Sequence, residues 1–218
     1  GAQSPGLVGP AWVQVVDGVN LERLSPPRVI AGGEADVDHF GPVVAYTGGA
    51  SSSFAVAHWS RRDVPSMPVF ELIVRLHGRD GTFYGASSVA TESKLFEGFA
   101  NRLLLQTIPR GTNGRALLSW SLPHTPSPGG VGAELWSTVI VVSSSGVAIL
   151  NSPPQLALHI PLSGPYFARR DFRATPLDDG MSAIYAWSEH FNASSPAVSR
   201  IRTCIAGGLH LPSASAFT

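Results

Sequence analysis

Short apolar runs recur along this chain at intervals of about ten to fifteen residues, separated by turn-forming residues. Glycine and proline account for 23 and 18 of the 218 residues and are spread along the chain. Because both residue types interrupt regular structure, they divide the apolar runs into short extended segments. The pattern predicts an all-β sandwich or barrel with about eight or nine strands.

The clearest predicted strand covers residues 156–162, where apolar residues occupy every second position. Alternation with a period of two places successive side chains on opposite faces of a sheet. We expect a core face made of Leu156, Leu158, Ile160 and Leu162, and an outer face made of Gln155, Ala157 and His159. Pro161 has no N–H group to donate, so this strand should lie at a sheet edge or end there.

An antiparallel pair of strands is predicted for residues 102–108 and 116–122. The Asn113-Gly114 pair between them supplies the positive φ that a tight turn requires. In the second strand Leu118, Trp120 and Leu122 share one face, while Ser119 and Ser121 share the other. Further strand candidates are residues 12–16, 43–46, 54–59, 136–142, 182–187 and 198–205.

One segment has a helical pattern instead. Ser66 is suited to cap a helix and Pro68 to occupy its first turn. Apolar residues then recur at helical spacing, at Val69, Leu72, Ile73 and Leu76. We therefore expect a short helix over residues 66–76 and a helical turn within residues 85–99. Long loops are predicted at residues 25–41, 123–132 and 164–180, a length typical of functional or packed loops.

Charge is scarce in this sequence. Charged residues make up 14% of the chain, against about 25% in an average globular protein. Much of the surface must then consist of small polar and apolar groups, which favours burial against partner subunits. The 15 basic and 15 acidic residues balance, and no run of Lys or Arg exceeds two. This argues against a basic arm that binds nucleic acid tightly.

Three further features restrict the class of protein. The single cysteine, Cys204, excludes an internal disulfide and is interpreted as a small buried apolar residue. No stretch of about 18 apolar residues is present, so no membrane span is expected. The chain begins Gly1-Ala2-Gln3, without an initiator Met or a signal-peptide pattern, which indicates trimming or cleavage from a longer precursor.

Catalytic motifs are absent from the sequence. Neither a serine-hydrolase elbow, nor a zinc-protease motif, nor a phosphate-binding loop occurs, so no catalytic residue and no cofactor is assigned. The seven histidines are too widely spaced for a local metal cluster, and each is interpreted as a loop or strand-face residue. Together they provide a means of tuning subunit contacts near about pH 6.

An acidic loop is the one candidate for a metal site. Glu34, Asp36 and Asp38 bring oxygen ligands together between glycines in a way that suits Ca²⁺. No bidentate Glu follows at the spacing of a calcium-binding loop. We therefore interpret these residues as a solvated acidic loop and assign no metal ligand.

The one concentrated basic region consists of Arg169, Arg170 and Arg173, with Asp171 between them. We interpret these arginines as part of a salt-bridged surface loop, which contributes little to stability. The alternative is that they contact neighbouring subunits or a genome.

The order of the predicted elements is informative as a whole. A strand at residues 54–59, a short helix at 70–75 and the segment 96–102 precede a strand that ends in Pro123 before a proline-rich loop. The strand at 156–162 is followed by Gly164-Pro165-Tyr166, and residues 182–187 and 201–211 form a closing pair. Over about residues 40–211 this order resembles the jelly-roll coat proteins of the picornavirus-like order (Picornavirales) of small icosahedral RNA viruses.

The resemblance implies an all-β, eight-stranded antiparallel jelly-roll β-sandwich with one or two short helices and long loops. It implies an extended N-terminal arm over residues 1–40, the jelly-roll domain over residues 41–211 and a C-terminal tail over residues 212–218. It further implies a non-enzymatic polyprotein cleavage product. This product would assemble in the host cytoplasm with copies of itself and related capsid proteins into an icosahedral virion. Viral RNA would contact the inner surface and a host receptor the outer surface.

Two other classes of protein remain as alternatives. A carbohydrate-binding, lectin-like β-sandwich would place exposed aromatic residues such as Tyr166, Phe167 and Trp187 on a binding face. A hydrolase would need Ser, His and Asp residues that only the fold brings together.

Overall fold

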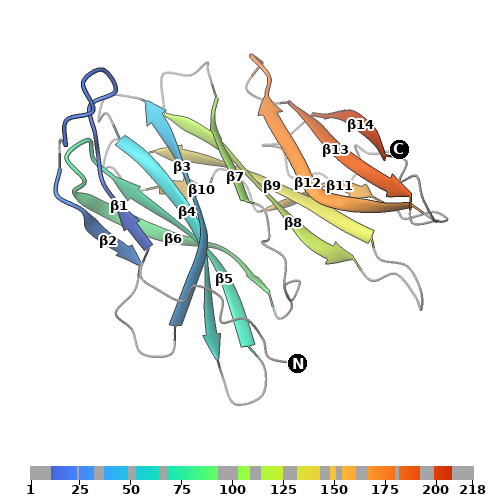
Figure 1. The fold of residues 1–218 in the computed structure, drawn as a ribbon, viewed down its shortest axis with the longest axis horizontal. Helices are drawn as coiled ribbons and strands as arrows, with labels where there is room; N and C mark the ends of the chain where they lie inside the picture. The colour runs from blue at the N-terminus through green and yellow to red at the C-terminus, as the bar shows by residue number, and fades with distance from the viewer. Residues whose placement is uncertain are drawn as a thin grey trace.

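The computed structural model describes residues 11–23, 25–31, 37–48, 53–63, 68–92, 103–108, 114–124, 132–142, 148–150, 154–160, 166–179, 182–191 and 199–207. These residues contain fourteen β-strands in antiparallel sheets and no helix. The all-β fold predicted from the sequence is therefore confirmed, and the antiparallel sheets are consistent with a β-sandwich (Figure 1).

Three larger sheets make up most of the structure. The first sheet has the order β3 (Val37–Gly48), β4 (Ser53–Asp63), β5 (Pro68–His77) and β6 (Phe83–Glu92). The second sheet contains β7 (Leu103–Thr107), β8 (Arg115–His124) and β9 (Gly132–Val142), with β10 (Ala148–Leu150) and β11 (Gln155–Ile160) both paired to β9. The third sheet consists of β12 (Tyr166–Pro176), β13 (Ala183–Phe191) and β14 (Ser199–Ala206). A small fourth sheet pairs β1 (Ala11–Val13) with β2 (Arg28–Ala31).

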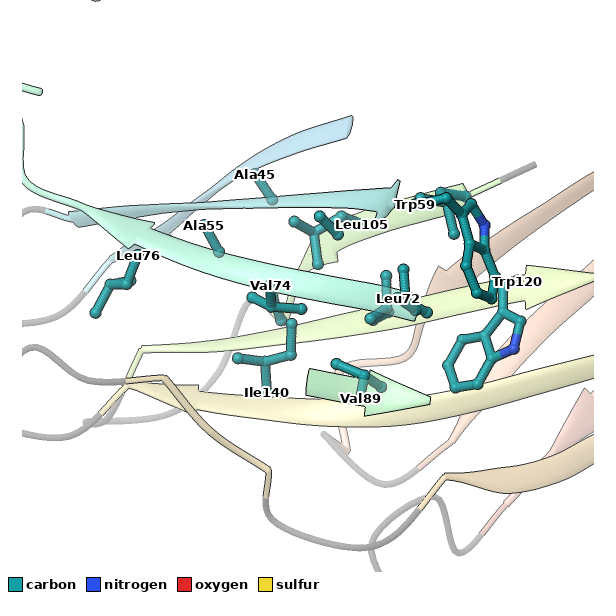
Figure 2. Packing of buried hydrophobic residues seen from close by; sticks show 14 of the residues in the cluster. Ala45, Ala55, Trp59, Leu72, Val74, Leu76, Val89, Leu105, Trp120 and Ile140 are labelled. Atoms are coloured by element: carbon teal, nitrogen blue, oxygen red, sulfur yellow. The ribbon is translucent and has the colours of Figure 1, made fainter. Parts of the chain in front are cut away.

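The first core lies between the first and second sheets. Trp59 of β4 and Leu72 of β5 are fully buried against Trp120 of β8 and Ile140 of β9 (Figure 2). Burial of each large apolar side chain contributes about 1.5–3 kcal/mol to folding. This cluster therefore fixes the first sheet onto the second.

A second core lies on the opposite face of the second sheet. Leu117 of β8 and Val139 of β9 are buried there together with Phe172 of β12 and Tyr185 of β13. The second sheet is thus covered on both faces. For that reason nearly every described residue in the middle of β8 and β9 is buried. The result is a three-layer arrangement with the second sheet in the middle (Figure 1).

The predicted pairing of the strands at residues 102–108 and 116–122 is confirmed. β7 pairs antiparallel with β8, from Leu103 opposite Trp120 to Thr107 opposite Ala116. Leu118, Trp120 and Leu122 share the face in the first core, as expected. Ser119 and Ser121 are also buried, because the third sheet side of β8 is covered as well. Asn113 of the predicted turn lies outside the described residues.

The helix expected over residues 66–76 is wrong, because residues 68–77 form β5. This strand pairs with β4 on one side and with β6 on the other, so its backbone hydrogen bonds are satisfied by neighbouring strands. Leu72, Val74 and Leu76 are fully buried at a period of two, which overrides the helical spacing read from the sequence. The helical turn expected within residues 85–99 is replaced by β6 up to Glu92, and residues 93–99 lie outside the described residues.

The expected placement of Leu156 in the core and of Ala157 on the outer face is also wrong, while the side chains of Leu158, Ile160 and Leu162 lie outside the described part of the structure. Leu156 is 37% exposed, whereas Ala157 is 1% exposed and belongs to the second core. A register shift between Leu156 and Leu158 changes the pairing with β9, and the covered face is the one that carries the small side chain. The edge position is confirmed, since β9 is the one partner of β11 among the described strands.

The eight-strand count and the jelly-roll connectivity in two sheets are not confirmed by the described strands. A jelly roll is built from two Greek keys over two sheets, so that strands next to each other in the chain often lie in different sheets. Here β3 to β6, β7 to β10 and β12 to β14 each follow the order of the chain within one sheet. Hairpin connections close short loops and therefore cost less conformational entropy than long crossovers.

The expected domain boundaries stay predictions. Residues 1–40, expected as an extended arm, include β1 and β2 and an isolated bridge between Val16 and Arg23. β3 begins at Val37, so the boundary at residue 40 falls within a strand. Residues 212–218 lie outside the described residues. The part of the chain that the structure describes has no helix of the length and apolarity that a membrane crossing needs.

Candidate functional site

The outer face of the third sheet carries exposed isoleucine side chains. Ile201 and Ile205 of β14 are 79% and 67% exposed, and Ile184 lies directly opposite Ile205 on β13. Because side chains alternate along a strand, Cys204 and Ala206 point the other way and pack at the second core. An apolar outer face of this kind indicates contact with another molecule.

β14 also lies at an edge of its sheet. Among the described strands it pairs with β13 alone, from His190 opposite Ser199 to Ala183 opposite Ala206. An edge strand presents backbone N–H and C=O groups to which a strand of another chain can be added. The apolar face and the edge together define the candidate interface, made by Ile184, Ile201, Thr203 and Ile205.

The predicted basic region lies in β12 and not in a loop, which corrects the long loop expected at residues 164–180. Phe172 and Ala174 are buried while Arg173 and Thr175 are exposed, an alternation that fixes this segment as a strand. Arg173 lies opposite Ala186, on the same outer face as Ile184, and its Nη1 donates to the Phe172 carbonyl at 3.1 Å. Arg169 and Arg170 are in β12, but their side chains lie outside the described part of the structure.

The predicted acidic loop is only partly described. Glu34 and Asp36 lie outside the described residues, and the backbone of Asp38 pairs with Arg61 inside the first sheet. Asp38 is thus a strand residue and not a loop residue. No group of three or more His, Cys, Asp or Glu side chains within the described residues is arranged to hold a metal ion.

His58 of β4 is a feature that the sequence did not reveal. Its side chain is fully buried on the outer face of the first sheet, and neither ring nitrogen has a hydrogen-bond partner. The His39 ring lies 5.2 Å away in an edge-on arrangement. Burial, and then the charges of Arg75 and His39, lower the pKa of His58 from 6.5 to about 3. His58 is therefore neutral at physiological pH.

His77 of β5 has a similar environment at the other end of the same face. Its ring stacks on Phe54 with a centroid separation of 5.4 Å and is 5.7 Å from Phe83. Burial lowers the pKa of His77 more than the Gly81 carbonyl, 3.4 Å from Nδ1, raises it. The sequence pattern indicates loop or strand-face positions for the histidines, and His77 directly follows the expected helix, so the burial of these two side chains had no local signal.

A buried hydrogen-bond chain links the second and third sheets. The Ser137 hydroxyl of β9 is 2.8 Å from the Ser119 hydroxyl of β8 and 2.6 Å from the Tyr185 hydroxyl of β13. All three residues are buried. Burial raises the pKa of Tyr185, so the phenol stays protonated and takes part in this chain as a neutral group.

Of the three aromatic residues suggested for a lectin-like face, Trp187 alone has a described side chain. Trp187 is half-buried and packs against the second core. The side chains of Tyr166 and Phe167 lie outside the described part. Comparison of this chain with protein-family models, with curated proteins and with solved structures finds no match.

Proposed function

We propose that this protein is a non-enzymatic structural subunit that assembles with copies of itself and with related subunits. The observation that carries the proposal is the exposed isoleucine face of β13 and β14 beside a strand edge. Exposed apolar area of this kind is stabilised when a partner covers it. The low content of charged residues, 14% of the chain, supports the same reading.

The particular assembly proposed is the icosahedral coat of a picornavirus-like virus, with the protein located in the virion. The proposal does not depend on jelly-roll connectivity, because assembly requires self-complementary surfaces and not one order of strands. In this arrangement Arg173, on the outer face of the third sheet, would contact a neighbouring subunit or the RNA genome. A host receptor would contact the outer surface of the shell.

The test is the state of association of the full chain. We expect the wild type to form dimers or larger particles that sedimentation and electron microscopy detect. The double variant Ile201→Asp/Ile205→Asp should weaken association at least about a hundredfold, because two exposed carboxylates would have to be desolvated in place of apolar side chains.

The matched control is Val19→Asp, since Val19 is 95% exposed in a turn away from the third sheet. This variant should associate like the wild type. A wild-type chain that stays monomeric at all concentrations, or a double variant that assembles normally, would refute the proposal.

A further inference from the structure

A pocket of about 310 Å³ lies at the outer side of the first sheet. Residues 15–18 form one wall, and Tyr46, Phe54 and Arg79 form the rest. None of these residues belongs to the third sheet, so the pocket is separate from the candidate interface. Its volume is at the lower end of the range of about 300–1,000 Å³ usual for small-molecule sites.

Two aromatic rings give the pocket an apolar surface. Tyr46 of β3 and Phe54 of β4 are direct cross-strand partners on the same face of the sheet. Tyr46 is 57% exposed, so a ligand can reach its ring. Phe54 is held in place by its stack on His77, and the Thr107 hydroxyl donates to the Tyr46 carbonyl and fixes the backbone beside the pocket.

Two opposite charges complete the pocket. Asp17 Oδ1 accepts hydrogen bonds from the backbone N–H groups of Val19, at 2.8 Å, and Asn20, at 3.2 Å. These bonds hold the carboxylate in position and lower the pKa of Asp17, and the charge of Arg79 lowers it further. Asp17 is therefore ionised at neutral pH, with a guanidinium on the same pocket.

This combination restricts the class of ligand. A ligand with a single net charge would be attracted by one of the two groups and repelled by the other. A neutral sugar ring avoids this conflict, because its hydroxyl groups can donate to the carboxylate and accept from the guanidinium. Its apolar C–H face can at the same time cover an aromatic ring.

We propose that this pocket binds a neutral sugar residue, stacked on Tyr46 and hydrogen-bonded to Asp17 and Arg79. The proposal goes beyond assembly and is independent of it, because the two sets of residues do not overlap. It also differs from the lectin-like face suggested by the sequence, which would use Tyr166, Phe167 and Trp187.

The experiment is a screen of the labelled full chain on an array of neutral and charged glycans, followed by NMR titration with the best free sugar. We expect binding to a neutral sugar. Tyr46→Ala and Asp17→Asn should each weaken binding about tenfold or more, whereas Tyr46→Phe should retain most of it because the ring is kept. Thermal unfolding of each variant verifies that the fold is intact.

The control variant is Tyr84→Ala, which removes an exposed tyrosine of β6 that does not line the pocket and should bind like the wild type. The proposal is overturned if neither the array nor the titration detects binding of a neutral sugar. It is also overturned if binding survives both Tyr46→Ala and Asp17→Asn, or if a zwitterion such as a free amino acid binds in place of sugars. Loss of assembly in the Ile201→Asp/Ile205→Asp variant leaves all these outcomes unchanged.

Discussion

At the residue scale, His58 shows how a polar side chain can depend on the whole sheet around it. It lies in β4 between Trp59, which enters the first core, and Ala57, which does the same. The alternation therefore turns His58 to the other face, where it is fully buried without a hydrogen-bond partner. An unpartnered buried polar group costs about 1–3 kcal/mol, and the neutral imidazole is the form in which that cost is smallest.

The first prediction is that stability decreases on acidification because of His58. Its pKa in the folded state, about 3, is below the ordinary value of 6.5, so the unfolded state binds a proton first as pH falls. Stability is then lost from about pH 6.5 downward, by about 2 kcal/mol between pH 7.5 and pH 5. Lowering of the pKa of His77 acts in the same direction. Urea unfolding at several pH values measures this loss.

His58→Phe provides the comparison, because it removes the titrating group and keeps a ring of similar size. The free energy of unfolding of this variant should fall about 2 kcal/mol less than that of the wild type between pH 7.5 and pH 5. The raised pKa of Glu92 has the opposite effect on the pH dependence of stability, since protonation of that carboxyl favours the folded state. Glu92 is present in both proteins, so its contribution cancels in the comparison. Equal pH dependence of the two proteins would show that His58 is not the source.

At the element scale, β11 shows that a strand can be assigned correctly while the burial of two of its residues, Leu156 and Ala157, is assigned incorrectly. The alternation in residues 155–160 predicted a strand, and β11 covers that range. Hydrophobicity alone selected Leu156 for the core, yet the third sheet covers the face that carries Ala157. A small side chain is favoured there because the second core is already filled by Phe172 and Tyr185.

The second prediction compares two substitutions in this strand. Ala157→Leu should destabilise the protein by about 1–3 kcal/mol, because the larger side chain has no space in a packed core. Leu156→Ala should change stability by less than about 1 kcal/mol, since Leu156 is already partly exposed. Urea unfolding measures the free energy of unfolding of both variants. A larger loss of stability for Leu156→Ala than for Ala157→Leu would mean that Leu156 lies in the core, as expected from the sequence.

At the scale of the whole molecule, the second sheet is bound on both sides, and its contact to the third sheet includes polar groups. The hydroxyl groups of Ser119, Ser137 and Tyr185 form one buried chain across that contact. In surroundings of low polarity such a chain stabilises one arrangement of the two sheets, because any other leaves hydroxyl groups without partners.

The third prediction concerns this chain. Tyr185→Phe removes the phenol hydroxyl but keeps the ring in the second core, so the protein should lose about 1 kcal/mol of stability. Tyr84→Phe, which removes a hydroxyl from an exposed tyrosine of β6, should change stability by less than about 0.5 kcal/mol. Denaturant unfolding monitored by fluorescence measures both. Equal effects of the two substitutions would mean that the buried chain contributes nothing.

Local patterns were sufficient for several features. Alternating side chains and turn-forming glycine and proline predicted an all-β protein, the pairing of β7 with β8, the core face of β8 and the edge position of β11. Each of these depends on residues close together in the chain. The low content of charged residues indicated that an interface exists but not where it lies. Among the predicted contact residues Arg173 alone has a described side chain, and it lies on the same outer face as the candidate interface.

Other features depend on segments that are distant in the chain. Residues 68–77 are a strand because β4 and β6 pair with them, although their spacing alone favours a helix. The pocket combines residues 15–18 with Tyr46, Phe54 and Arg79, and the burial of His58 and Ser119 follows from what lies over their faces. The sequence by itself determined that strands form and about where several of them lie. Only the tertiary structure decided how many sheets stack and which strands are buried on both faces. The reason is that a strand face becomes buried only when another surface packs against it, and that surface comes from a distant part of the chain.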